Sequence, residues 1–248
     1  MVSKGAVAAV SPNGIAARAA TIFTCVIDGR SLEDVLFGPD GLTSAASADT
    51  LLVDHTSIDP NECRALAARA RSVCGLRMID APISGGSAAA VEGKLVGWLG
   101  GDAEDVERVK PLIAHYIAKA THMGAIGQGQ LSKSCNQFIV ASTIALWSQM
   151  LRYAESCGLD PSLLIEALEG GAADSPISRA FGRQIVDGNV PTASIRNQTK
   201  DLRIILDHRG EGGGWPLVEA ALQEFLLYIG RQEDPRNRSA KAPGAGEG

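Results

Sequence analysis

Two short stretches of the sequence carry residues whose types and spacing suit chemistry on a small, oxygen-rich molecule. In the first, Ser84 is followed by Gly85 and Gly86. Two glycines behind a serine form a backbone that can turn its N–H groups and one hydroxyl toward a bound anion. In the second, Lys133 and Asn136 are three residues apart and share one face of a predicted helix. Apolar surroundings lower the pKa of a lysine and fit it for proton transfer, while an asparagine can orient a hydroxyl or carbonyl oxygen.

Each stretch also has a purely structural interpretation. Residues 84–86, the Ser84 loop, can be a tight turn between two strands, because turns are where glycine usually lies. Lys133 and Asn136 can be solvated residues near a helix start, since most helical lysines are on the surface. Thr56 and Ser57, which follow another predicted strand, can simply cap a helix. The residues alone leave these alternatives open.

The wider pattern resembles the 3-hydroxyisobutyrate dehydrogenase family, also called the β-hydroxyacid dehydrogenases. Around the Ser84 loop, the matching positions of that family's substrate-binding signature are Asp80, Ser84, Gly85, Gly86, Ala90 and Gly93. The stretch GQGQLSKSCN, residues 127–136, is similar to the second family signature, in which the lysine is catalytic. The stretch NQTKDL, residues 197–202, is similar to a third. All three occur in the family's order, and the resemblance runs collinearly from about residue 5 to about residue 232.

This resemblance implies an NAD(P)-dependent oxidoreductase. Its substrate would be a small β-hydroxy acid or its semialdehyde, similar to 3-hydroxyisobutyrate, and its cofactor NAD or NADP. The implied catalytic residues are Lys133 and Asn136, the implied substrate-binding residues are Ser84, Gly85, Gly86 and Asn136, and the implied cofactor-binding residues are Ser57, Lys200, Val26 and Ile27. No metal ligand set is implied. Imine reductases are related, but many place another residue at the lysine position, so Lys133 favours hydroxy-acid chemistry.

The order of predicted elements indicates a doubly wound α/β fold that positions these loops. Apolar, β-branched runs predict buried parallel strands at residues 21–27, 51–54 and up to 80, with helices at 31–37 and 61–72 between them. Ligands in such sheets bind beyond the carboxyl ends of the strands, so the loops after these strands are expected to line one cleft. A strand at 95–99, a helix at 103–118 and a brief strand at 120–122 follow.

From residue 124 the character changes to helix. Helices are expected at residues 130–157, 161–169, 176–186, 199–208 and 215–230. The predicted domains are a Rossmann-like α/β domain (1–123), a helical domain (124–232) joined by the long helix, and a disordered tail (233–248). The family resemblance implies that the helical domain is of the 6-phosphogluconate dehydrogenase-like C-terminal type.

The sequence departs from the family in lacking the turn G-x-G-x-x-G, which holds a dinucleotide's pyrophosphate at a helix N-terminus. We therefore expect an N-terminally truncated sheet, with about 35–45 residues missing, roughly one βαβ unit. The alternative to an active enzyme is a catalytically inactive, truncated paralogue that acts as a dimerisation or scaffold module.

Composition bears on the possible partners and location of the protein. The 248 residues are 45% hydrophobic and 21% charged, and the net charge of −5 disfavours nucleic-acid binding. No apolar run approaches the 18 or so residues of a membrane span. Five cysteines without C-x-x-C spacing indicate thiols in a reducing compartment, so a cytoplasmic protein is expected. The family resemblance implies a homodimer or homotetramer.

Overall fold

The structure is a computed structural model that describes residues 3, 5–208 and 214–233. The chain divides into two compact units, Met1–Lys133 and Ser134–Gly248. Helix α6 (Gln128–Ser156) begins in the first unit and continues into the second. The predicted tail, 233–248, lies outside the described residues apart from Glu233, which ends the last helix.

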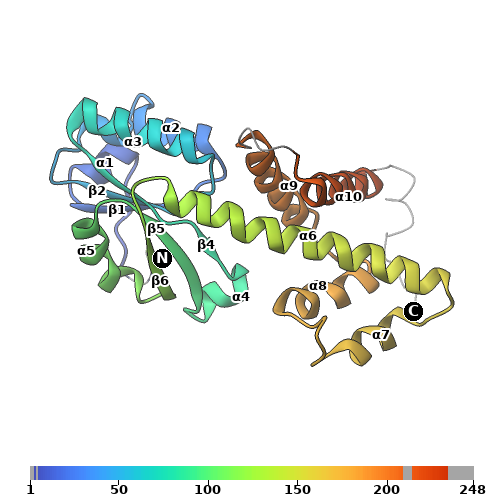
Figure 1. The fold of residues 1–248 in the computed structure, drawn as a ribbon. Helices are drawn as coiled ribbons and strands as arrows, with labels where there is room; N and C mark the ends of the chain where they lie inside the picture. Colours follow the sequence, from blue (N-terminus) through green and yellow to red (C-terminus); the bar gives the residue numbers. More distant parts are fainter. Residues whose placement is uncertain (1–2, 4, 209–213, 234–248) are drawn as a thin grey trace, which may run out of the picture. The chain divides into compact units, whose positions relative to one another are not determined.

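A mixed six-stranded sheet forms the centre of the first unit (Figure 1). Its strand order is β1-β2-β3-β5-β4, and β6 pairs with β5. The strands are β1 (Thr21–Thr24), β2 (Leu51–Asp54), β3 (Arg77–Asp80), β4 (Ile83–Ser84), β5 (Leu95–Gly100) and β6 (Ile117–Gly124). Strands β1 to β3 are parallel and in register, whereas β5 runs antiparallel to β3 and β4. The predicted α/β alternation is therefore confirmed for the parallel half.

Helices cover both faces of this sheet (Figure 1). Successive side chains of a strand point to opposite faces, so Leu52 and Met78 pack with helices α2 and α3, while Val53 and Ile79 pack with α5. The helices of this unit are α1 (Pro12–Ala16), α2 (Gly29–Phe37), a 3-10 turn η2 (Leu42–Ser44), α3 (Pro60–Cys74), α4 (Gly86–Val91) and α5 (Ala103–Ile113). The apolar cores on the two faces of the sheet hold the strands in place, and the loops that follow the strands lie at their ends.

Local capping explains the helix starts that the sequence placed only roughly. The Asp28 carboxylate accepts from the Ser31 N–H, so α2 begins at Gly29 rather than at the predicted Ser31. The Asp59 carboxylate accepts from the N–H groups of Asn61 and Glu62 and caps α3. Capping of this helix by Thr56 or Ser57, the structural alternative, is therefore wrong.

Three further predicted boundaries differ from the structure. Residues 86–91 form a short helix, α4, where no helix was predicted between the Ser84 loop and the strand at 95–99. Helix α5 continues through Pro111 but ends at Ile113 instead of 118, because the chain from Ile117 pairs with β5 as strand β6. Helix α9 begins at Thr192 instead of 199, because Ile195 already packs into the core of the second unit.

The second unit is helical, as predicted. Besides most of α6 it contains α7 (Pro161–Leu168), α8 (Pro176–Val186), α9 (Thr192–Asp207) and α10 (Pro216–Glu233). Its core gathers apolar side chains of α6, α9 and α10, among them Ile144, Leu202 and Phe225. Within the described ranges, none of the helices combines the length and apolar character needed to cross a bilayer.

Candidate active site

The Ser84 loop has a backbone that only glycine adopts readily. Gly85 and Gly86 have φ values of +126° and +69°, and both are exposed. A Cβ on Gly85 would lie 2.7 Å from the Cβ of Ala89, so a larger residue would also clash. Ser84 is half-buried and pairs with Val96 in the β4–β5 ladder. The loop therefore presents a hydroxyl and two glycines from the rigid edge of a sheet.

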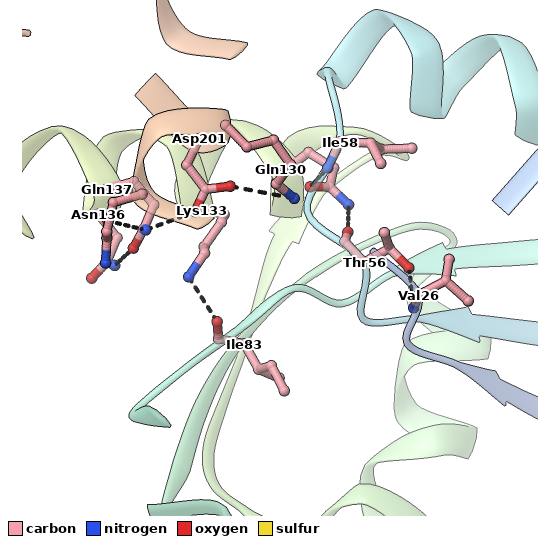
Figure 2. Close-up of polar contacts among 11 residues, drawn as sticks. Val26, Thr56, Ile58, Ile83, Gln130, Lys133, Asn136, Gln137 and Asp201 are labelled. Carbon is pink, nitrogen blue, oxygen red and sulfur yellow. Dashed lines mark hydrogen bonds and ion pairs between the residues drawn. The ribbon is translucent and has the colours of Figure 1, made fainter. Parts of the chain in front are cut away.

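Lys133 lies next to this loop. Its Nζ donates to the carbonyl oxygen of Ile83 at 2.9 Å, one residue before Ser84 (Figure 2). The lysine side chain is half-buried. The first unit thus brings together the lysine of one predicted motif and the serine–glycine loop of the other, although 50 residues separate Lys133 from Ile83.

The first turn of α6 is anchored to the end of strand β3 by a buried carboxylate. Asp80 is fully buried, and its two oxygens accept from the N–H groups of Gly127 and Gln130, each at 2.7 Å. A Cβ on Gly129 would lie 2.7 Å from Asp80 Oδ2 and 2.5 Å from the Trp98 carbonyl oxygen, so this close approach requires glycine. Burial raises the pKa of the Asp80 carboxyl, and the N–H donors act in the opposite direction. Asp80 thus positions the helix that carries Lys133.

The predicted cofactor-side residues lie at the carboxyl ends of β1 and β2. The Val26 N–H donates to the Thr56 hydroxyl at 3.1 Å, which joins the two loops (Figure 2). Ile27 is 68% exposed, and Ser57 is half-buried. An exposed apolar side chain and a hydroxyl at this edge fit one ring and one polar group of a dinucleotide, because doubly wound sheets bind such ligands there.

Asp54, at the end of β2, is a buried carboxyl that sequence reasoning did not single out. Its Oδ1 accepts from the hydroxyls of Thr24 and Thr56 at 2.8 and 2.6 Å, while Oδ2 is buried without a hydrogen-bond partner. Burial, partly offset by these hydrogen bonds, raises the pKa of Asp54 to about 6. The sequence did carry a signal for this residue, since Asp54 is the acidic end of an otherwise apolar strand, Leu51–Asp54.

This raised pKa predicts a pH-dependent stability. The folded-state pKa lies above the unfolded value, so the contribution of Asp54 is fully present below about pH 4 and is lost as the pH rises through about 6. Asp54→Asn keeps the acceptor and removes the charge. The difference in free energy of unfolding between Asp54→Asn and wild type should shift in favour of the variant by about 1–1.5 kcal/mol when the pH is raised from about 5 to about 8. Urea unfolding at both pH values measures this; a pH-independent difference would contradict the assignment.

His55 is hydrogen-bonded to Ala81, which follows β3 and precedes the Ser84 loop. Its Nδ1 lies 2.6 Å from the Ala81 carbonyl oxygen, and its Nε2 lies 2.8 Å from the Tyr116 hydroxyl. A carbonyl oxygen only accepts, so Nδ1 carries the proton and the Tyr116 hydroxyl donates to Nε2. Burial lowers the pKa of His55 and raises that of Tyr116 to about 12, which keeps the pair neutral.

In the second unit, a polar cluster contains Asn136 and Lys200. The Asn136 Nδ2 donates to the Gln137 Oε1 at 2.9 Å, and the Gln137 Nε2 donates to Asp201 Oδ2 at 2.7 Å (Figure 2). The Lys200 Nζ lies 3.5 Å from Asp201 Oδ1. Gln137 and Asp201 are both buried, so they fix the orientation of Asn136 and Lys200.

The arrangement suits proton transfer and anion binding. The first unit contains a half-buried lysine next to a serine–glycine loop. It also contains the hydrogen-bonded loops at the carboxyl ends of β1 and β2. In the part of the chain that the structure describes, no group of three or more His, Cys, Asp or Glu side chains could hold a metal ion. Besides Asp54, sequence reasoning missed the role of Thr56 as the joint between two loops and that of Gln130 as a buried anchor of α6.

Two family models match the chain. Residues 1–124 match the family model of the NAD binding domain of 6-phosphogluconate dehydrogenase. Residues 127–241 match that of the NAD-binding domain of NADP-dependent 3-hydroxyisobutyrate dehydrogenase. The cofactor is therefore NAD or NADP.

Curated relatives lead to the same family, and a solved structure shows the same fold. The 2-hydroxy-3-oxopropionate reductase of Escherichia coli (strain K12) is 36% identical over 207 residues, which are 83% of this chain and 70% of that protein. The probable 3-hydroxyisobutyrate dehydrogenase-like 3, mitochondrial, of Arabidopsis thaliana is 38% identical over 184 residues, which are 74% of this chain and 57% of that protein. The crystal structure of a 3-hydroxyisobutyrate dehydrogenase from Salmonella typhimurium shares the fold, with a TM-score of 0.82, 23% identity, and coverage of 91% of this chain and 80% of that one. The chain belongs to the 3-hydroxyisobutyrate dehydrogenase, or β-hydroxyacid dehydrogenase, family of oxidoreductases.

Proposed function

We propose that the protein is an NAD(P)-dependent dehydrogenase or reductase that interconverts a small β-hydroxy acid of the 3-hydroxyisobutyrate type and its semialdehyde. The observation that carries this proposal is the placement of Lys133 Nζ at 2.9 Å from the Ile83 carbonyl, beside the Ser84 loop. A proton-transferring group and an anion-binding loop on one small surface suit a substrate that carries a hydroxyl and a carboxylate. The bound nicotinamide supplies the hydride chemistry.

The chain's own residues would bind the substrate and move one proton. In the oxidative direction Lys133 Nζ, as a neutral amine, would accept the proton of the substrate hydroxyl; in the reductive direction the ammonium would return it to the carbonyl oxygen. Ser84, Gly85 and Gly86 would hold the carboxylate through a hydroxyl and backbone N–H groups. Asn136, one helical turn beyond Lys133 along α6, would orient the reacting oxygen.

The cofactor would be held from the loops that follow β1 and β2. Val26, Ile27 and Ser57 would contact it there, and the family motif assigns Lys200 to the same role. The ion pair of Lys200 with Asp201 supports a fixed position for that ammonium group.

The alternative is a catalytically inactive module for dimerisation or scaffolding. Against it, Lys133 and the Ser84 loop retain both their residue types and their proximity. A titration of the purified chain with NADH and with NADPH, followed by nicotinamide fluorescence, separates the two functions. Micromolar binding of either nucleotide supports the enzyme, whereas no binding by a chain that circular dichroism shows to be folded supports the scaffold.

The role of Ser84 gives a specific kinetic prediction. Ser84→Ala removes one hydrogen bond to the substrate carboxylate, and hydrogen bonds to charged groups contribute about 1.5–3 kcal/mol. We therefore expect KM for the hydroxy acid to rise about 10- to 100-fold, while the Kd for NADH or NADPH stays within about two-fold of wild type. Ser87→Ala, an exposed serine in α4, is the matched control and should leave KM unchanged. Equal KM values in both variants would contradict the carboxylate role.

The relatives provide the first substrates to test, 3-hydroxyisobutyrate and 2-hydroxy-3-oxopropionate. We further propose domain limits of 1–123 and 124–232, supported by family matches that end at residue 124 and resume at residue 127. A homodimer or homotetramer in the cytoplasm is proposed from the family resemblance and the cysteine pattern. Light scattering of the purified chain and localisation of a tagged chain test these two proposals.

A further inference from the structure

Gln130 is a buried amide at the start of α6 that brackets Ser57. Its Nε2 donates to the carbonyl oxygen of Thr56 at 2.6 Å, and the N–H of Ile58 donates to its Oε1 at 3.1 Å (Figure 2). The residue is only 1% exposed. An amide is costly to bury unless both of its polar atoms are bonded, and here both are. The two bonded backbone groups are those on either side of Ser57.

The backbone of Gln130 is tied to a second element. Its N–H donates to Asp80 Oδ2 at 2.7 Å, which joins the first turn of α6 to the end of β3. Lys133 lies three positions further along the same helix, and its Nζ donates to the Ile83 carbonyl, three residues beyond Asp80. Any shift of the Gln130 backbone therefore moves the start of the helix segment that carries Lys133.

The loop that Gln130 holds is joined in turn to the loop after β1. The Thr56 hydroxyl accepts from the Val26 N–H at 3.1 Å and donates to Asp54 Oδ1 at 2.6 Å. One buried side chain thus connects the loops after two parallel strands with the helix turn that leads to Lys133. Two hydrogen bonds of one side chain, one to a backbone carbonyl and one from a backbone N–H, fix both the position and the orientation of a loop.

We propose that Gln130 is a positioning residue that holds the backbone around Ser57 in register with Lys133, an inference that rests on the proposed function. The consequence differs from that of a purely catalytic change. Loss of Gln130 should weaken nucleotide binding and lower turnover together, because both the cofactor-side loop and the lysine depend on it. Loss of Lys133 should lower turnover alone.

Two substitutions and one control test the proposal. Gln130→Met keeps the length of the side chain and removes both hydrogen bonds. Gln130→Glu converts the amide into an acid that, when protonated, can still donate to the Thr56 carbonyl and accept from the Ile58 N–H. Once ionised, it loses the donor and places a charge against a carbonyl oxygen. Gln128→Met makes the same chemical change as Gln130→Met in the same helical turn and serves as the control.

The first readout is the Kd for NADH and for NADPH from nicotinamide fluorescence, at a temperature where circular dichroism shows each variant to be folded. We expect Gln130→Met to raise Kd about 10- to 100-fold over Gln128→Met, as for two lost buried hydrogen bonds. Burial at this position raises the pKa of a carboxyl above its ordinary value of about 4.3, so the glutamate should be largely protonated near pH 5 and ionised near pH 8. Gln130→Glu should therefore bind within about three-fold of wild type near pH 5 and at least about ten-fold more weakly near pH 8. The other ionisable groups around this network are Asp54, His55, Cys63, Arg64, Asp80 and Lys133. Wild type carries all of them, so its Kd at the same pH values corrects for their titration. An unchanged Kd in Gln130→Met, or a pH-independent ratio in Gln130→Glu, would overturn the proposal.

The second readout does not depend on nucleotide binding. Hydrogen exchange of the backbone amides should show lost protection in both residues 56–58 and residues 127–131 of Gln130→Met, and in neither segment of Gln128→Met. If wild type binds neither nucleotide, the proposed function fails, and this exchange pattern alone decides the role of Gln130. Unchanged protection in either segment, or equal loss in the control, overturns the inference. Should Gln130→Met not fold, Gln130→Glu compared near pH 5 and pH 8 gives the same test.

Discussion

Lys133→Met is expected to lower turnover of the hydroxy acid by about 10²- to 10⁴-fold, the usual contribution of general acid–base catalysis. Methionine keeps most of the apolar stem of the side chain and removes the amine that reaches the Ile83 carbonyl at 2.9 Å. The proton of the substrate hydroxyl then has no acceptor of the right geometry. Steady-state kinetics under saturating nucleotide measure the effect.

The binding of nucleotide separates this role from a structural one. The hydrogen bonds that join the cofactor-side loops run from the Val26 N–H to the Thr56 hydroxyl and from the Gln130 amide to the Thr56 carbonyl, and neither uses the lysine amine. The Kd for NADH or NADPH should therefore stay within about two-fold of wild type. Lys119→Met, an exposed lysine on β6 in the same unit, is the control and should retain full turnover. A Lys133→Met variant that keeps more than about a tenth of wild-type turnover would remove Lys133 from the mechanism.

The second large effect is on stability. Asp80→Ala should lower the free energy of unfolding by about 3–5 kcal/mol, since it leaves two buried N–H groups, those of Gly127 and Gln130, without their charged acceptor. Such a loss is a large part of the net stability of a typical domain. Urea denaturation followed by circular dichroism measures the change.

Two comparisons show whether the anchoring of α6 is the cause. Asp80→Asn keeps an acceptor for one of the two N–H groups and should lose about half as much stability as Asp80→Ala. Asp49→Ala, at an exposed aspartate in a loop of the same unit, should change stability by less than about 0.5 kcal/mol. Equal losses in Asp80→Ala and Asp49→Ala would contradict the role given to this carboxylate.

The sequence predicted those parts of the fold that depend on local pattern. An apolar run placed β2, and the apolar pair Met78 and Ile79 placed the end of β3. The helix predicted at residues 176–186 is α8. The short helix α4 was missed because its alanines and glycines also suit a turn. The start of α9 was placed late because residues 192–198 owe their helical state to packing around Ile195, which a polar sequence does not reveal.

The candidate site was predictable only where a motif carried it. The Ser84 loop and Lys133 were identified from spacing and resemblance, and the structure places them side by side. The buried network of Asp54, Thr56 and Gln130 joins residues up to 74 positions apart, so no local pattern could show it. The roles of Asp80 and Gln130 as anchors of α6 follow from these long-range hydrogen bonds.

The proposed reaction is the nicotinamide-dependent oxidation and reduction of a small β-hydroxy acid. The most direct measurement is the absorbance of reduced nicotinamide when the purified chain is mixed with 3-hydroxyisobutyrate and NAD⁺ or NADP⁺, or with 2-hydroxy-3-oxopropionate and NADH or NADPH. We predict turnover of at least one of these pairs by wild type and its near-complete loss in Lys133→Met. A chain that is folded by circular dichroism, binds neither reduced nucleotide and turns over neither substrate would contradict the account.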